Sequence, residues 1–254
     1  MVPRLVVAAG LAAVALVVSG SSDAAEPAGV SAPWLVRRAQ ESVRFAGTGH
    51  VTASGVGVVD GRRWSVNRDG DYDLARHRWN EEDSYAVDGD AWWSFLVGTP
   101  EVLYETESVS RGTPPGKWYT VEPHYEPGTP PAVQAVLAFA AGPAARPEGD
   151  GWSVEGTVSM RLAVVLLGVN AGTPDDTARA LVTASDHRAP ATLVVGPDRR
   201  VRELRLRGDA LGPTPFLPDA MRRTLPGARN TSRFLDLGLP VSVVAPQPYQ
   251  WAQP

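Results

Sequence analysis

The residues that could carry acid-base or metal chemistry are scattered along this sequence. Its histidines are far apart and none lies in a His-Glu-x-x-His arrangement: His50, His77, His124 and His187. Asp69, Asp71 and Asp73 begin like a calcium loop, but Leu74 stands where that loop needs its turn glycine. The chain has no cysteine, which excludes disulfides and thiolate ligands. We therefore predict neither a metal site nor a cofactor.

Covalent and nucleotide-dependent catalysis also lack a sequence signature. The chain contains no Gly-x-Ser-x-Gly elbow and no glycine-rich phosphate loop. Glu81 and Glu82 are neighbours, so an extended chain would direct their carboxylates to opposite faces of a sheet. The sequence therefore indicates a protein that is not an enzyme.

One stretch concentrates positive charge. Between Ala189 and Gly208 the apolar run Thr192–Val195 is followed by the turn Gly196-Pro197-Asp198 and by a second alternating run, which predicts a β-hairpin. Its arginines are Arg199, Arg200, Arg202, Arg205 and Arg207. Guanidinium groups can bind an anionic head group, and they equally suit the wet face of an antiparallel sheet. Both interpretations stay open.

Composition bounds the class of protein. A chain of 254 residues that is 43% hydrophobic can bury a substantial core, and we expect one domain and a monomer. The net charge of −4 and the isoelectric point near 5.6 provide no basic field for nucleic acid. Lys117 is the only lysine beside many arginines, alanines, glycines and prolines, a bias typical of GC-rich bacterial genomes.

The N-terminus has the architecture of a signal peptide over residues 1–24. Arg4 precedes the apolar run Leu5–Val18, which is shorter than the roughly 20 residues of a membrane-spanning helix. This pattern predicts export to the cell envelope or the extracellular space. Val18-Ser19-Gly20-Ser21 is similar to a lipobox in which Ser21 replaces the lipid-modified cysteine. Serine cannot form the thioether, so the sequence leaves open whether the protein is secreted or membrane-tethered.

A flexible lead-in over residues 25–33, a domain over 34–246 and a tail over 247–254 complete the expected organisation. In the first half we expect a helix over 33–44, strands over 45–60, 63–73 and 76–80, a hairpin over 83–96, and strands over 102–107 and 117–122. In the second half we expect a helix that starts after Pro130-Pro131 and ends at Gly142-Pro143, a strand over 152–158, helices over 160–167 and from Thr173, the 192–207 hairpin, an irregular segment over 211–228, and strands over 234–237 and 241–244. This order predicts an α+β fold in which helices cover one face of an antiparallel sheet.

Four segments in this order resemble the actinobacterial LppX/LprG-type lipoproteins, whose fold is similar to that of the carrier LolA. They are Val87–Trp92, Gly116–Trp118, Val154–Ser159, and Ala191–Arg205 together with Leu237–Val241. The resemblance covers about Ala39 to Pro246. It implies a half-barrel, a large curved antiparallel sheet with helices packed on its concave face, which holds acyl chains of a lipid or lipidated molecule outside the cytoplasm. Members are normally lipoproteins, so Ser21 departs from the pattern.

Burying a free acyl chain is favourable by about 0.8 kcal/mol for each methylene, which is the physical basis of such a carrier. Apolar periodicity predicts that the cavity is lined from helices and strands by Trp92, Phe95, Val133, Val136, Leu137, Phe139, Leu162, Val165, Leu166, Leu181 and Leu206. The alternative is that these side chains fill a solid core.

The function predicted from the sequence is an extracytoplasmic carrier that binds a lipid or an acylated ligand without catalysis. Trp92, Trp93, Trp118 and Tyr125 could form a mouth that meets an amphipathic ligand or a membrane surface. The alternative is an RseB-like regulatory sensor that binds a protein partner. The helix opening Trp34–Arg37 and the motif Phe45-x-Gly47 resemble that class, which has a second domain for which this chain is short.

Overall fold

The computed structural model describes residues 30–106, 117–121, 125–169 and 174–246. These residues form α1 (Ala32–Ala46), α2 (Pro131–Leu137), α3 (Met160–Leu166), α4 (Pro174–Ala184) and α5 (Asp219–Thr224). Their strands are β1 (Thr48–Val59), β2 (Arg62–Asp73), β3 (Arg78–Val87), β4 (Asp90–Gly98), β5 (Leu103–Thr106), β6 (Trp118–Val121), β7 (Ala140–Glu148), β8 (Gly151–Ser159), β9 (Arg188–Val195), β10 (Val201–Arg207) and β11 (Arg229–Leu235). The predicted signal segment, Thr173 and the tail over 247–254 lie outside the described residues.

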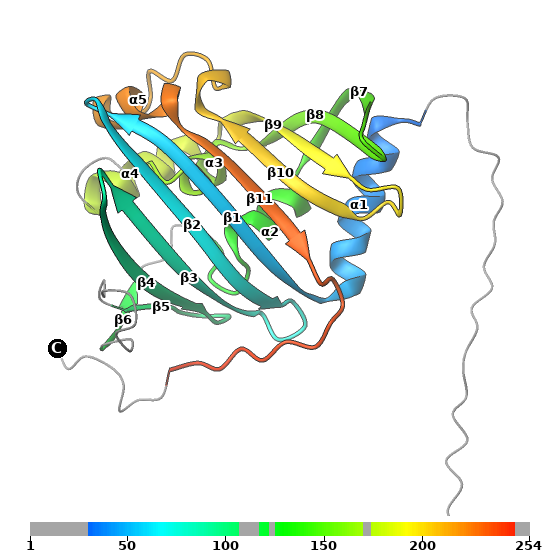
Figure 1. The fold of residues 1–254 in the computed structure, drawn as a ribbon, viewed down its shortest axis with the longest axis horizontal. Helices are drawn as coiled ribbons and strands as arrows, with labels where there is room; N and C mark the ends of the chain where they lie inside the picture. The colour runs from blue at the N-terminus through cyan, green and yellow to red at the C-terminus, as the bar shows by residue number, and fades with distance from the viewer. Residues whose placement is uncertain (1–29, 107–116, 122–124, 170–173, 247–254) are drawn as a thin grey trace, which may run out of the picture.

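All the described strands belong to one open sheet of 11 strands in the order β6-β5-β4-β3-β2-β1-β11-β10-β9-β8-β7. Each neighbouring pair is antiparallel. The last strand, β11, lies between β1 and β10 and joins the N-terminal meander to the C-terminal strands (Figure 1). The α+β fold expected from the sequence, a large curved antiparallel sheet with helices on its concave face, is confirmed.

Glycines in β1 let large side chains of β2 lie across the helix-covered face of the sheet. Gly49 pairs with Tyr72, and Gly57 pairs with Trp64. A Cβ at either glycine would come within 2.7 Å of the facing aromatic side chain. Because both glycines lack that atom, the aromatic rings can pack flat against the β1 backbone. We call this helix-covered face the inner face and the opposite one the outer face.

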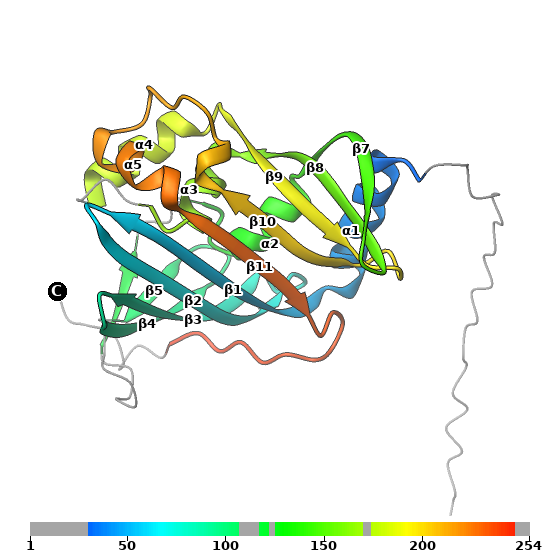
Figure 2. The ribbon, with the colours of Figure 1, turned by 45° about the horizontal axis from the view of Figure 1, so that its top comes forward.

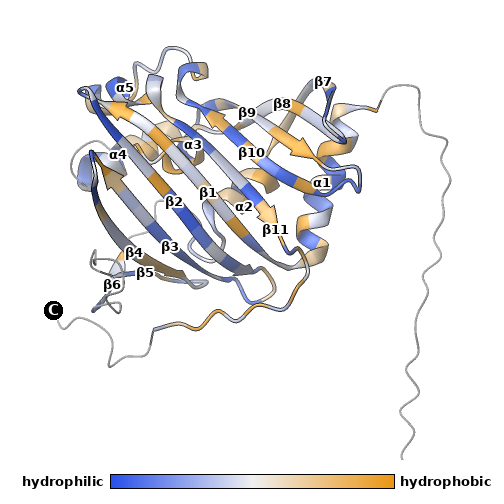
Figure 3. Ribbon diagram, in the orientation of Figure 1, coloured by the Kyte–Doolittle hydropathy of each residue, from blue (hydrophilic) through white to orange (hydrophobic). Residues whose placement is uncertain are grey.

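The helices cover the inner face (Figures 1 and 2). Helix α1 is capped by Ser31, whose side chain accepts a hydrogen bond from the amide of Trp34, and it buries an apolar stripe that includes Leu35 and Val43. Gln40 donates to the carbonyls of Val136 and Phe139, which ties α1 to the end of α2. Along β10 the buried residues Val201, Leu204 and Leu206 are separated by polar residues, among them the exposed Arg202 and Arg207, and Figure 3 shows this strand in orange and blue. The sheet is therefore covered on one side and wet on the other.

The expected stop at Gly142-Pro143 is wrong, because the chain runs on there as β7. This strand is an edge of the described sheet, with an irregular register between Ala141 and Ala145. Proline cannot donate to a ladder, but on an edge strand that donor can point away from the partner. The edge position therefore accommodates both Pro143 and Pro147.

Three further expectations near the C-terminus need correction. The segment expected to be irregular contains the short helix α5, and the strand expected over 234–237 is β11, which begins at Arg229. Residues 241–244 form no strand, although Val243 packs against an apolar cluster of Val97, Tyr104 and Trp118. No helix in the described ranges combines the length and the apolar character needed to cross a lipid bilayer.

Candidate functional site

The structure divides the predicted lining residues among three places. Nine of them pack in the main core between the helices and the sheet: Val133, Val136, Leu137, Phe139, Leu162, Val165, Leu166, Leu181 and Leu206. Phe95 packs in the separate cluster with Val97 and Tyr104. Trp92 lines a cavity. The role of the nine core residues as cavity lining stays a prediction, and their packing fits the solid-core alternative.

Trp92 identifies the candidate site, a cavity of about 560 Å³ between one end of the sheet and the helices. Its lining comes from strands β2 to β5, from the turn after α3 and from α5. The lining residues are Asp60, Trp64, Ser65, Tyr85, Ala86, Val87, Trp92, Ser94, Glu105, Gly168, Ala220, Arg223 and Thr224. We call it the aromatic cavity, because the sheet supplies Trp64, Tyr85 and Trp92.

Local structure fixes the walls of the aromatic cavity. Tyr85 and Trp92 are directly opposite in the β3–β4 ladder, and their rings stack with centroids 5.7 Å apart and planes 12° apart. Gly168 follows α3, has a positive φ of 69° and lies beside the Trp64 indole. A Cβ added to Gly168 would lie 3.4 Å from the indole ring. At the rim, Arg223 lies 3.9 Å from Asp60.

A buried polar cluster adjoins the cavity on the inner face of β2 and β3. The Arg68 Nε lies 3.5 Å from Oδ2 of Asp83 and 3.8 Å from Oε1 of Glu81. The same guanidinium donates to the Leu166 carbonyl at 3.1 Å, at the C-terminal end of α3, where a cation is favourable. The Tyr85 hydroxyl donates to Asp83 at 2.7 Å, so this tyrosine belongs to both the polar cluster and the cavity wall.

Burial sets the protonation of this cluster. Burial opposes the charge on Arg68, but the Asp83 and Glu81 carboxylates outweigh it and raise the Arg68 pKa. Burial, reinforced by the nearby Asp83 charge, raises the pKa of Glu81 well above its ordinary value. The same two causes raise the pKa of Glu105. The interior therefore favours a proton on Glu81, while Arg68 stays charged beside Asp83.

Three polar atoms of the site are buried without a hydrogen-bond partner among the described residues: Nε1 of Trp64, Oδ1 of Asp83 and Oγ of Ser94. Asp83 is 3% exposed and Ser94 is 2% exposed. Buried polar groups are normally satisfied, so such atoms indicate strain or a missing partner. Ser94 is one of the residues that line the aromatic cavity.

The arginines of the 192–207 hairpin have partners within the protein. Arg202 pairs with Asp150, Arg205 pairs with Glu148 and Glu203, and Arg207 pairs with Asp209. Since neighbouring carboxylates compensate these guanidinium groups, the structure favours the wet-face interpretation over an anion-binding surface.

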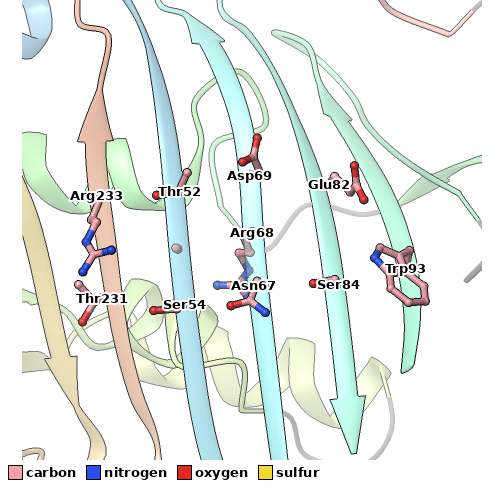
Figure 4. Close-up of a pocket in the computed structure, with 11 residues that line it drawn as sticks. Thr52, Ser54, Asn67, Arg68, Asp69, Glu82, Ser84, Trp93, Thr231 and Arg233 are labelled. Carbon is pink, nitrogen blue, oxygen red and sulfur yellow. The ribbon is translucent and has the colours of Figure 1, made fainter. Parts of the chain in front are cut away.

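The outer face carries a different depression of about 440 Å³ (Figure 4). Figure 4 shows its side chains side by side on β11, β1, β2, β3 and β4. They are mostly short or charged, among them Thr52, Asn67, Asp69 and Glu82. Trp93 lies here, whereas its neighbour Trp92 faces the aromatic cavity. This depression is polar and lacks the apolar walls that a hydrocarbon needs.

The four aromatic residues predicted to share a mouth are separated. Trp118 packs in the cluster with Val97 and Tyr104, and Tyr125 packs near Trp79, with ring centroids 6.3 Å apart. Within the described ranges, no three histidine or acidic side chains converge where they could hold a metal ion. His50 pairs with Asp71 and Asp69, at 2.9 and 3.4 Å.

No protein-family model and no curated protein matches this sequence. Among solved structures, the chain is similar to the lipoprotein LppX of Mycobacterium tuberculosis, with a TM-score of 0.43 and 11% identity over 84% of this chain and 99% of that one. It is also similar to a LolA superfamily protein from Nitrosomonas europaea, with a TM-score of 0.30 and 7% identity over 82% of this chain and 93% of that one. At this level of identity the likeness concerns the fold alone.

Proposed function

We propose that this protein is an exported, non-catalytic carrier that binds a lipid or an acylated molecule in the aromatic cavity. The observation that carries the proposal is the cavity itself, about 560 Å³ in volume and walled by aromatic side chains on the helix-covered face of the sheet. Small-molecule sites are typically concave spaces of about 300–1,000 Å³ with apolar walls and a few polar groups. The aromatic cavity has that size and that lining.

The apolar wall provides the driving force. Trp64, Val87, Trp92 and the ring of Tyr85 supply hydrocarbon surface at which an acyl chain would leave water. Eight buried methylenes contribute about 6 kcal/mol before the cost of association is subtracted. Of the residues predicted to line a cavity, Trp92 belongs to this wall. We propose that the nine core residues stabilise the helices and strands that carry the wall.

The cellular setting follows from the sequence. We propose that residues 1–24 direct export, so that the carrier works in the cell envelope or outside the cell as a monomer. A membrane surface is then the natural donor or acceptor of its ligand.

The first test is native mass spectrometry of the full-length protein made in an actinobacterial host and purified without detergent. We expect a protein species with the added mass of a lipid, and organic extraction should release that lipid. Protein that carries no extractable lipid, and that also fails to bind a fluorescent fatty acid added afterwards, would contradict the carrier proposal.

The second test uses two adjacent tryptophans. Trp92→Ala should weaken the binding of a fluorescent fatty acid about tenfold, because it removes apolar contacts worth about 1.5 kcal/mol. Trp93→Ala is the matched control, since that side chain lies in the depression on the outer face. Ala220→Trp, which narrows the cavity from α5, should also weaken binding. If all three variants bind the fatty acid as tightly as the parent protein does, the ligand binds outside the aromatic cavity.

A further inference from the structure

We infer that the aromatic cavity selects a ligand whose polar end is an organic cation, an ammonium group carried on a hydrocarbon chain. The inference rests on the proposed carrier function and deepens it by naming the chemistry of the head group. It stands on three features of the cavity: its balance of charge, its unpartnered polar atoms and its aromatic faces.

The inner end of the cavity is acidic. Glu105 lines it, and Glu81 and Asp83 lie next to it on β3, whereas Arg68 is the one cation among the described residues in this cluster. The other described guanidinium at the cavity, that of Arg223, lies at the rim beside the carboxylate of Asp60. Since the interior favours a proton on Glu81 and Arg68 is paired with Asp83, Glu105 is the carboxylate in this cluster that would attract a cation and repel an anionic head group.

Two of the unpartnered atoms are oxygens that can accept a hydrogen bond. The Ser94 hydroxyl and Oδ1 of Asp83 are buried without a hydrogen-bond partner among the described residues, whereas the third unpartnered atom, Nε1 of Trp64, is a donor. Leaving a buried polar group unsatisfied is costly, whereas a hydrogen bond to a charged group is among the stronger ones. A primary ammonium offers three donors, which suits the oxygens of Ser94 and Asp83.

The aromatic walls favour the same charge. The faces of tryptophan and tyrosine rings carry negative potential and attract cations within about 6 Å, most strongly where water is excluded. The stacked pair of Tyr85 and Trp92 and the indole of Trp64 line the same cavity as Ser94 and Glu105. A cationic head group could therefore pass along aromatic surface to reach the carboxylate, and its hydrocarbon chain would stay against the same rings.

The test compares four probes that share an eight-carbon chain, below their micellar concentrations at pH 8: octylamine, octyltrimethylammonium, octyl glucoside and octanoate. Isothermal titration calorimetry on the full chain measures the dissociation constants. We expect both cations to bind at least about tenfold more tightly than octyl glucoside, with octanoate the weakest. Glu105→Gln should weaken octylamine about tenfold and change octyl glucoside by less than about twofold. Glu101→Gln, the same charge change at an exposed site, should leave both unchanged.

The outcomes separate the two proposals. If octanoate binds as tightly as octylamine, or if Glu105→Gln weakens the amine and the glucoside equally, the cationic head group is wrong and the carrier stands. If no octyl compound binds, both proposals fail. Should Glu105→Gln not fold, Ser94→Ala decides, because its hydroxyl has no described hydrogen bond to lose. An octylamine affinity that Ser94→Ala leaves unchanged would then overturn the inference.

Discussion

Arg199 occupies an unusual position at the turn between β9 and β10. Its backbone is left-handed, with a φ of 65°, a conformation that costs a non-glycine residue roughly 1–2 kcal/mol. Its guanidinium lies 5.0 Å from the ring centroid of Trp152 and 5.6 Å from that of Trp34. The two cation–π contacts join the tip of the hairpin to the start of α1. The sequence indicated Arg199 as one of several surface arginines. In the structure it connects the β9–β10 turn to α1 and β8 through Trp34 and Trp152.

We predict that Arg199→Ala lowers the free energy of unfolding by about 1–2 kcal/mol, because cation–π contacts of partly buried rings have that magnitude. Arg200→Ala is the control. Its side chain is 57% exposed and lies 3.7 Å from Asp198, so its loss should cost less than about 0.5 kcal/mol. Urea unfolding followed by tryptophan fluorescence measures both. Equal stability of the two variants would mean that the contacts with Trp34 and Trp152 contribute nothing.

At the scale of elements, the parts of the fold that local chemistry determines could be predicted from the sequence. Asp60-Gly61 and Asp88-Gly89 specify tight turns, and the hairpins they join are present. The strand β7 and the helix α5 could not be predicted, because the edge of the sheet and the neighbouring elements stabilise them rather than their own residues. In the same way, nothing in the 34–246 sequence indicated that β11 would lie between β1 and β10.

Of the strand residues expected to line the cavity, Trp92 lines the aromatic cavity and Phe95 packs in a separate cluster, and alternation along the strand explains this difference. Positions of opposite parity in a strand point to opposite faces, so Trp92 and Phe95 could not line one cavity. The same rule predicted that Glu81 and Glu82 would diverge, and they do, since Glu82 lines the depression on the outer face. That Glu81 and Asp83 point inward could not be predicted from hydrophobic patterning, which assigns the inner face to apolar residues. Arg68, on the neighbouring strand β2, compensates them.

Arg68 connects β2 to the end of α3, and we predict that Arg68→Met lowers the free energy of unfolding by about 3–5 kcal/mol. The change leaves Asp83 buried without its cation and removes the donors to the Leu166 and Val165 carbonyls. Arg63→Met, on the exposed side of the same strand, is the matched control and should cost less than about 0.5 kcal/mol. Adding Asp83→Asn to Arg68→Met should cost less than the sum of the single changes, because the two groups interact.

At the scale of the whole molecule, the two faces of one sheet have different chemistry. The outer face pairs its charges in water, as Arg205 does with Glu148 and Glu203. The inner face buries an apolar core next to a small acidic cluster at one end. A purely apolar interior would be simpler to stabilise, because buried ion pairs contribute little net stability. We interpret the acidic end as the part of the interior that serves ligand binding, and its protonation should be visible in the stability of the whole domain.

Glu81 should make the protein less stable as the pH rises. Its pKa in the folded protein lies well above that of an ordinary glutamate, so the folded state holds this proton more tightly than the unfolded chain does. The resulting stabilisation is complete below the ordinary glutamate pKa of about 4.3 and is lost as the pH rises through the folded value. Glu81→Gln keeps the shape of the protonated side chain and cannot ionise, so its free energy of unfolding should fall less than that of the parent between about pH 5 and 8. Urea unfolding at a series of pH values measures how the free energy of unfolding of each protein changes with pH. Glu82→Gln, on the outer face, is the control and should follow the parent. Parallel curves for all three proteins would show that Glu81 ionises normally inside the fold.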